Sequence, residues 1–354
     1  MRGFSLLSDT PTGVYLPSNP ETITWGRLPC EADRPVLSVD PGQAITIDTV
    51  SHEGMLEDQG GDPLAYFTGQ GIPADQVLPE SIAIAAKVPH NPDDGPHIVT
   101  GPIEVRGAQP GDLLVVNVRE LTPRAPYGVI SNRHGRGALP GEYPRGPGNV
   151  SILAHAGDDD GQLTGTIKFG YSDAREMRFP LRPFLGIMGV AVAGPERPHS
   201  VPPGPHGGNL DIAMLQAGTS LMIPVQVPGA LAYVGDPHYA QGDGEVAMTA
   251  FEAPLRAKLS FSLLRGADAD QFGPVESPIG QVGQFLLPTG LDPDLGEALR
   301  KCVRNSISLL GSRFGVGPEH ALAYLSAAVD FRISQVVDLV CGVHAVIDTS
   351  SLGT

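Results

Sequence analysis

Three segments of the sequence repeat one local pattern, in which a short β-like stretch is followed by a glycine turn and an alternating strand. They are LSVDPGQAITIDT (37–49), IEVRGAQPGDLLVVNV (103–118) and DIAMLQAGTSLMIPVQV (211–227). In the second segment, Leu114, Val116 and Val118 share one face, because side chains in a strand alternate with a period of two. Glycine in the turn accepts the positive φ that a tight turn requires. The pattern predicts a body of β-sandwich or jelly-roll type.

The composition agrees with a β-rich body. The 354 residues include 45 glycines and 35 prolines, while only 18% are charged, which favours many turns and short elements over helical bundles. Helical periodicity is confined to the end of the chain, over 292–311 and 317–329. In the first of these helices we expect Asp292 at the N-cap and Gly311 at the C-terminal end.

The segment that follows these helices, DFRISQVVDLVCGVHAVID (330–348), is apolar and β-branched and predicts two strands with a turn near Gly342. We therefore expect a mainly β fold with an α+β C-terminal part, in which the two late helices pack on further strands. The expected domains are a jelly-roll-like domain at 1–195 and a β-rich to α+β domain at 196–354 that completes the active site.

The charge balance restricts the partners. The chain has 39 acidic and 23 basic residues, a formal net charge of −16, so nucleic acid and anionic membranes are not expected partners. A neutral or cationic substrate fits this charge, as does simple solubility. The three cysteines have no regular spacing, and the start of the sequence has no apolar secretory segment, so we expect a cytoplasmic protein. Because the sequence has no long apolar window, we do not expect it to span a membrane.

The segment VGDPHYAQGDGEV (234–246) is the strongest candidate for chemistry. Asp236 and His238 are two residues apart, so on an extended backbone both side chains project to the same side. A carboxylate and a neutral imidazole suit zinc or another divalent ion. Asp243 and Glu245 repeat this spacing at the start of an expected strand over 245–252. An acidic, glycine-rich solvated turn is the structural alternative.

Other polar residues stand near predicted strand ends. HGGNLD (206–211) contains His206, Asn209 and Asp211, while His97 precedes one strand and the pair His52–Glu53 follows another. Each is explained singly as a structural residue, but strand ends in a β protein can converge on one opening. Motifs for a nucleophilic serine, a phosphate loop or a dinucleotide are absent from the sequence, so a nucleotide cofactor has no support.

At these residues the chain resembles the acetamidase/formamidase family of amide hydrolases. The matching segments follow the family's order over roughly residues 21 to 348 and are TGPIEVRGAQPGDLL (100–114), PLRPFLGIMGVA (180–191), HGGNLDI (206–212), VGDPHYAQGDGEV (234–246) and VDFRISQVVD (329–338). The resemblance implies a mainly β fold, hydrolysis of short aliphatic amides to carboxylate and ammonia, a bound metal ion and homo-oligomeric assembly.

The resemblance also implies a set of functional residues. It places polar family positions at His97, Asn209, Asp211, Asp236, His238, Gln241, Asp243, Glu245, Asp330 and Arg332. We expect His97, Asp236 and His238 to bind the metal, with zinc favoured and calcium as the alternative. Glu245 is the expected general acid/base, with Asp243 and Asn209 as further catalytic candidates. His206, Asp211 and Gln241 are candidates for binding a small neutral amide, and Asp330 with Arg332 for a structural ion pair.

Two segments, HNPDDGPHIVTGP (90–102) and the glycine- and proline-rich 127–149, depart from the family pattern. We expect 127–149 to form an extended surface excursion. GDDDG (157–161) is interpreted as a solvated turn, with calcium binding as the alternative.

Two rival functions remain open. One is a metal-containing β-sandwich that binds a sugar or small amide without catalysis. The other is an amidase with a cysteine nucleophile, which is disfavoured because no cysteine lies in the polar clusters.

Overall fold

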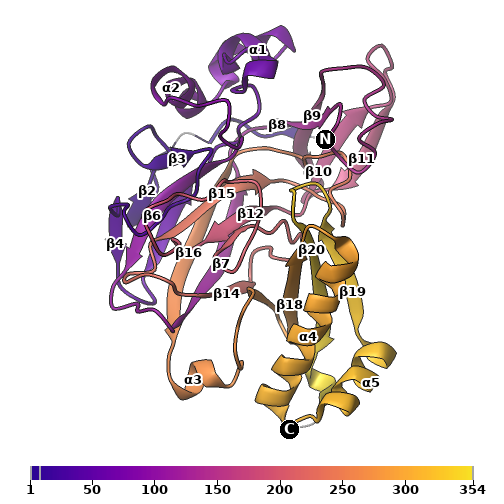
Figure 1. Ribbon diagram of the computed structural model, residues 1–354. Helices are drawn as coiled ribbons and strands as arrows, with labels where there is room; N and C mark the ends of the chain where they lie inside the picture. Colours follow the sequence, from indigo (N-terminus) through magenta and orange to yellow (C-terminus); the bar gives the residue numbers. More distant parts are fainter. Residues whose placement is uncertain (1, 8, 353–354) are drawn as a thin grey trace.

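The computed structural model describes residues 2–7 and 9–352. Among these residues the strands form three sheets, and the helices lie at two ends of the molecule (Figure 1). The largest sheet has the strand order β19-β20-β18-β17-β14-β7-β16-β5-β2. Its strands are β2 Val14–Leu16, β5 Ala44–Asp48, β7 Leu113–Pro123, β14 Ser220–Pro224, β16 Leu255–Leu264, β17 Ile279–Val282, β18 Phe285–Asp292, β19 Asp330–Gln335 and β20 Cys341–Asp348.

The second sheet has the order β13-β12-β15-β6-β3, with β4 also paired to β6. Its strands are β3 Ile23–Trp25, β4 Leu37–Val39, β6 Ile98–Val105, β12 Phe184–Gly189, β13 Gly207–Asn209 and β15 Ala232–His238. The third sheet has the order β1-β9-β10-β11, with β8 paired to β9. Its strands are β1 Arg2–Gly3, β8 Tyr127–Arg133, β9 Asn149–Asp159, β10 Gln162–Lys168 and β11 Glu176–Pro180.

The first two sheets share one apolar core. Ile45 and Val116 of the largest sheet belong to the same buried cluster as Ile103 and Val234 of the second sheet. This arrangement is a β-sandwich, and it follows from the alternation of apolar side chains along the strands. Both sheets contain strands from either side of residue 195. The division into domains 1–195 and 196–354 stays a prediction.

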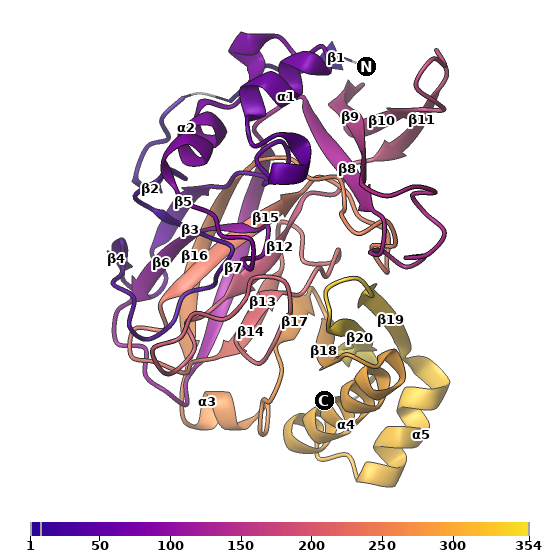
Figure 2. The ribbon, with the colours of Figure 1, turned by 45° about the horizontal axis from the view of Figure 1, so that its top comes forward.

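The late helices are α4 (Leu295–Phe314) and α5 (Pro318–Ala328), which pack with β18 and β20 around their own core (Figure 2). At Gly290 in β18 a Cβ atom would lie 2.1 Å from the carbonyl oxygen of Ala298, so glycine permits the close approach of α4. The mainly β fold with late helices on further strands is confirmed.

The ends of α4 differ from the prediction. The N-cap is Asp294, whose side chain accepts a hydrogen bond from the Glu297 backbone N–H at 2.8 Å, whereas Asp292 ends β18 and pairs with Lys301. Gly311 lies inside the helix, and Gly315, with φ of 67°, ends it.

Other short helices were not predicted from the sequence. They are η1 Glu57–Gln59, α1 Pro63–Gly69, η2 Ala74–Gln76, α2 Pro79–Lys87, α3 Ala267–Asp270 and η3 Thr349–Leu352. Of the helices in the described part of the chain, none has both the length and the apolar character needed to cross a membrane.

Three predictions, of a loop, a strand and a turn, need correction. Residues 127–133 form β8 rather than a loop, so the excursion is limited to 134–148. The described residues 245–252 do not form a strand, because Glu245 and Met248 have positive φ angles of 48° and 115°. The final turn covers 336–340, and Gly342 belongs to β20.

Candidate active site

Asp236 and His238 lie at the end of β15, which pairs with β12 on one side and β6 on the other. Both side chains are buried, and His238 Nε2 lies 3.2 Å from Asp236 Oδ2. The sequence placed this pair on a regular extended backbone, but Asp236 has a φ of 52°. The left-handed turn at Asp236, rather than strand periodicity alone, brings the two side chains together.

His97 approaches the other oxygen of Asp236 from the residue before β6. Its Nε2 lies 4.0 Å from Asp236 Oδ1, while its Nδ1 is 3.0 Å from the hydroxyl of Ser200. His52, in the loop after β5, meets the His97 ring edge-on at 5.5 Å between centroids. One ligand atom from each of His52, His97 and Asp236 lies within 4.8 Å of the others.

Glu252 completes a second group of three with Asp236 and His238. Glu252 Oε1 lies 2.9 Å from His238 Nε2, and all three side chains are buried. In the described part of the chain, His238 Nε2, Asp236 Oδ1 and Glu252 Oε2 have no well-directed hydrogen bond. Asp236 therefore lies between two sets of converging nitrogen and oxygen atoms.

These atoms fit a metal ion of the zinc type. Around an ion bonded tetrahedrally at about 2.0–2.1 Å, ligand atoms are about 3.3 Å apart. The distances from His238 Nε2 to Asp236 Oδ2, 3.2 Å, and to Glu252 Oε1, 2.9 Å, are close to this value. Imidazole nitrogen with carboxylate oxygen favours zinc over calcium, which takes six to eight oxygen ligands.

Gln241 fixes the tautomer of His238. Its side-chain nitrogen donates to the backbone carbonyls of Asp211 at 2.8 Å and Ser334 at 3.2 Å, so its Oε1 is left to accept from His238 Nδ1 at 3.1 Å. In the neutral imidazole this places the proton on Nδ1, and Nε2 faces the carboxylates of Asp236 and Glu252. A hydrogen bond of this kind behind a histidine is typical of metal ligands.

Gly186 of β12 provides the space in which these side chains converge. A Cβ atom at this position would lie 2.3 Å from Asp211 Oδ1, 2.6 Å from Asp236 Oδ2 and 2.9 Å from His238 Cε1. Any side chain at residue 186 would therefore displace groups of the site.

Positive φ angles are concentrated in and around this region. Among non-glycine residues, Asp211 has a φ of 48°, Asp236 of 52° and Glu245 of 48°. Such conformations cost on the order of 1–3 kcal/mol each and persist where function requires them. The surrounding fold therefore holds three buried acidic residues of this region in strained conformations.

Asp211, Glu245 and Asp338 form a group of buried carboxyls beside His238, whose Nδ1 is 3.8 Å from Asp211 Oδ1. Burial and the neighbouring Asp236 raise the pKa of Asp211 to about 7. Burial, with the carboxyls of Asp211 and Asp338, raises the pKa of Glu245 well above its ordinary value. These conditions favour the protonated form of Glu245, which is able to donate a proton.

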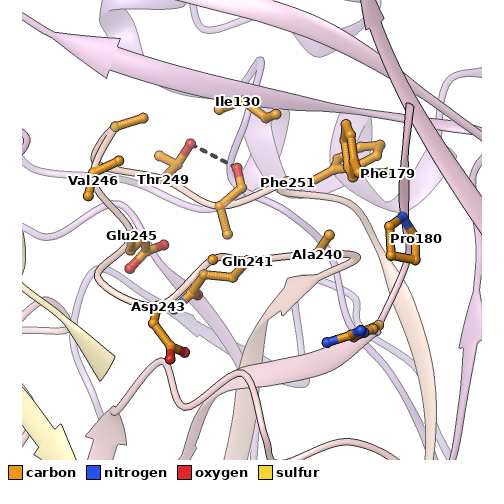
Figure 3. Close-up of a pocket in the computed structure, with 14 residues that line it drawn as sticks. Ile130, Phe179, Pro180, Ala240, Gln241, Asp243, Glu245, Val246, Thr249 and Phe251 are labelled. Atoms are coloured by element: carbon orange, nitrogen blue, oxygen red, sulfur yellow. Dashed lines mark hydrogen bonds between the residues drawn. The ribbon is translucent and has the colours of Figure 1, made fainter. Parts of the chain in front are cut away.

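A cavity of about 480 Å³, called the main cavity below, opens onto these groups. Asn209, His97 and Glu245 line it, together with Arg133 at the end of β8 and Arg136 in the excursion that follows. A second cavity of about 460 Å³ is lined by residues of the 240–251 segment, among them Asp243, Val246 and Phe251 (Figure 3). Glu245 lines both cavities.

The structure does not bring every expected residue to the main cavity. Asp243 lines the second cavity, and its half-exposed carboxylate is 3.8 Å from Arg332, so Arg332 contacts Asp243 rather than the expected Asp330 (Figure 3). His206 is buried outside the lining of the main cavity. Gln241 does not line the main cavity, and its side chain contacts His238 Nδ1.

Sequence reasoning missed three residues of the site. Glu252 lies in no recognisable motif, and Gly186 lies within the matching segment PLRPFLGIMGVA, where no pattern indicates a role for it. Asp338 ends the matching segment VDFRISQVVD, whose expected polar positions are Asp330 and Arg332. His52 was recognised as a polar residue at a strand end, and the structure places it beside His97.

Comparison with known proteins identifies the family of the chain. The acetamidase/formamidase family matches residues 88–197 and 192–349. A Schizosaccharomyces pombe protein is 28% identical over 193 residues, covering 42% of this chain and 47% of that protein. The match thus spans about half the length of that relative. A formamidase of Methylophilus methylotrophus is 25% identical over 302 residues, with 69% of this chain and 74% of that protein covered.

The crystal structure of an acetamidase from Bacillus halodurans has the same fold. Its TM-score is 0.73 at 23% identity, with 96% of this chain and 100% of that chain covered. The fold agrees with that structure, and the family match gives the class of protein. This chain belongs to the acetamidase/formamidase family.

Proposed function

We propose that this chain hydrolyses the C–N bond of short linear amides to a carboxylate and ammonia in the main cavity. The observation that carries the proposal is the convergence of five buried side chains, of which all but His238 line that cavity; they are His52, His97, Asp236, His238 and Glu252. Family membership supports it, as do the names formamidase and acetamidase of the similar proteins.

We further propose that a divalent metal ion, zinc rather than calcium, assists the reaction. His97, Asp236 and His238 were the ligands expected from the sequence, and the geometry adds His52 and Glu252 as candidates. When bound, the ion would supply Lewis-acid activation of water and of the amide carbonyl.

The remaining requirements fall to side chains of the cavity wall. Amide hydrolysis forms a bond from water oxygen to the carbonyl carbon and breaks the C–N bond, so the departing nitrogen needs a proton. Glu245 supplies this proton, because burial and its carboxyl neighbours hold it in the protonated form. Asn209 is buried with its Oδ1 unpartnered among the described residues, and it accepts a hydrogen bond from the substrate amide.

The experiment that tests this function is ammonia release by Glu245→Gln. We expect the rate with formamide to fall at least about 100-fold, the scale of general acid/base catalysis, while circular dichroism and zinc content stay unchanged. Asp243→Asn is the matched comparison, because Asp243 lies in the same loop but outside the main cavity, and we expect a much smaller loss. Near-normal turnover by Glu245→Gln would refute its role.

The rival functions receive less support. None of Cys30, Cys302 and Cys341 lines the main cavity, and burial raises the pKa of Cys302 to about 12, which disfavours a thiolate nucleophile. Iodoacetamide should therefore leave activity intact, whereas a chelator should reduce it. A protein that only binds amides would release no ammonia.

We also propose homo-oligomeric assembly and a cytoplasmic location. Phe169 and Tyr171, beside the hairpin of β10 and β11, are 55% and 80% exposed, and exposed aromatic side chains suit a subunit interface. The three free thiols agree with a reducing compartment.

A further inference from the structure

The main cavity is larger than a short amide requires. Acetamide has four non-hydrogen atoms and fills roughly the volume of three water molecules, about 90 Å³ at about 30 Å³ each. The cavity measures about 480 Å³, in the range of sites for larger ligands. Because the buried groups around Asp236 form its inner end, most of this volume lies beyond a short amide held there.

Apolar side chains from separate segments also line the cavity, and they are less buried than the groups around Asp236. They are Leu56 before η1, Pro92 after α2, Val201 before β13, Met248 in the loop after β15, and Leu339 between β19 and β20. Apolar walls favour ligands that bury apolar surface, because water is released from both surfaces. Charged side chains line the cavity as well and outnumber the apolar ones; those outside the buried groups are Glu57, Asp58, Asp93, Asp94, Arg133 and Arg136, of which Asp58 pairs with Arg133 and Asp94 with Arg27.

Two of these apolar residues have strained backbones. Leu339 has a φ of 64° with 60% of the residue exposed, and Met248 has a φ of 115°. Positive φ is uncommon for residues with bulky side chains, and such strain concentrates at ligand sites. The fold therefore holds an exposed leucine at the cavity wall in a conformation that asparagine or glycine would adopt more easily.

We propose that the preferred substrates are primary amides whose apolar acyl group has about five to eight carbons, such as hexanamide or benzamide. The amide lies at the Asp236 end, and the acyl group lies against Leu56, Val201 and Leu339. The reaction is the one proposed above, in which an amide and water give a carboxylic acid and ammonia, and this inference rests on that function.

The test is kcat/KM for ammonia release along the series formamide, acetamide, butanamide, hexanamide and benzamide, with the zinc-loaded full chain. We expect kcat/KM to rise about threefold to fourfold per methylene from acetamide to hexanamide. Leu339→Asn suits the left-handed backbone but removes the apolar contact, so the ratio of kcat/KM for hexanamide to that for formamide should fall about threefold or more. Leu322→Gln on α5, where the leucine is 51% exposed, is the matched control and should leave the ratio unchanged.

The outcomes separate this inference from the function on which it rests. A rising series with a reduced ratio in Leu339→Asn supports the proposal. A series that falls beyond acetamide overturns it while leaving amide hydrolysis intact, and a rising series with an unchanged ratio overturns the placement against Leu339. If no amide of the series releases ammonia, both the inference and the proposed function fail.

Discussion

Glu252 lies 2.9 Å from His238, with its Oε1 facing the histidine Nε2, although the two residues are not on neighbouring strands. An isolated β-bridge joins their backbones, and it places the carboxylate from the segment before β16 at the end of β15. The expected ligand pair Asp236–His238 thus gains a third member that no spacing in the sequence indicated.

We predict that Glu252→Gln lowers zinc affinity and ammonia release by at least about 100-fold, because an anionic candidate ligand is replaced by a neutral amide of the same shape. Isothermal titration with zinc and ammonia assays measure the two effects. Glu120→Gln changes an exposed glutamate and serves as the control. Unchanged zinc affinity in Glu252→Gln would remove Glu252 from the site.

Gly186→Ala should abolish activity with a modest cost in stability. The added methyl group would overlap Asp211 Oδ1 and Asp236 Oδ2, and overpacking of this kind costs about 1–3 kcal/mol. Gly141→Ala is the control, because a Cβ atom there meets no atom within 4 Å. Urea unfolding measures the loss of stability, and zinc content and ammonia release measure the loss of the site. Wild-type activity in Gly186→Ala would contradict the account.

Gln241→Ala should weaken zinc binding about 10- to 100-fold, because it removes the hydrogen bond that orients His238. Gln281→Ala changes an exposed glutamine outside the site and should have no effect. If Gln241 only stabilised the loop, unfolding would become easier while the zinc affinity of the folded protein stayed the same.

His344 should make stability depend on pH. Burial and the charge of Arg332 lower the pKa of His344 to about 4, below the usual value of about 6.5 in an unfolded chain. The neutral imidazole therefore contributes stability that is fully present above about pH 6.5 and is lost as pH falls toward 4. The unfolded chain binds up to one extra proton in this window, worth up to about 1.4 kcal/mol per pH unit.

His344→Asn should remove this contribution while keeping an acceptor for the hydroxyl of Ser334, which lies 2.8 Å from His344 Nδ1. Urea unfolding of both proteins from pH 8 to 4.5 measures the difference. The loss of stability below pH 6.5 should be smaller in the variant, after subtraction of the constant offset at pH 8. Parallel curves over the whole range would show that His344 is not the group responsible.

Local sequence predicted the features that depend on local physics. Alternating apolar residues indicated the strands, and His97 precedes its strand as expected. The prediction that strand ends meet also placed Asp236 near His97, because both strands belong to one sheet. The start of α4 was predicted too early, because Asp292 ends β18 and pairs with Lys301, while Asp294 is the N-cap.

The rest of the site depends on long-range packing. Separate loops and strands contribute His52, Gly186 and Asp338 to the site. Their positions near one site follow from the order of strands in the sheets rather than from their spacing in the sequence. A positive φ at Asp236 or Glu245 is likewise imposed by the surrounding fold. A glutamate on a solvated, glycine-rich turn would have the same local sequence as Glu245. Only the fold shows that Glu245 lines a cavity.

The most direct test of a metal-assisted amide hydrolase is a zinc titration of the metal-stripped full chain, with ammonia release from formamide and hexanamide as the readout. We predict that the stripped protein is inactive and that activity rises with added zinc to a plateau at a fixed stoichiometry. Full activity in the stripped protein, with no response to zinc, would contradict the account.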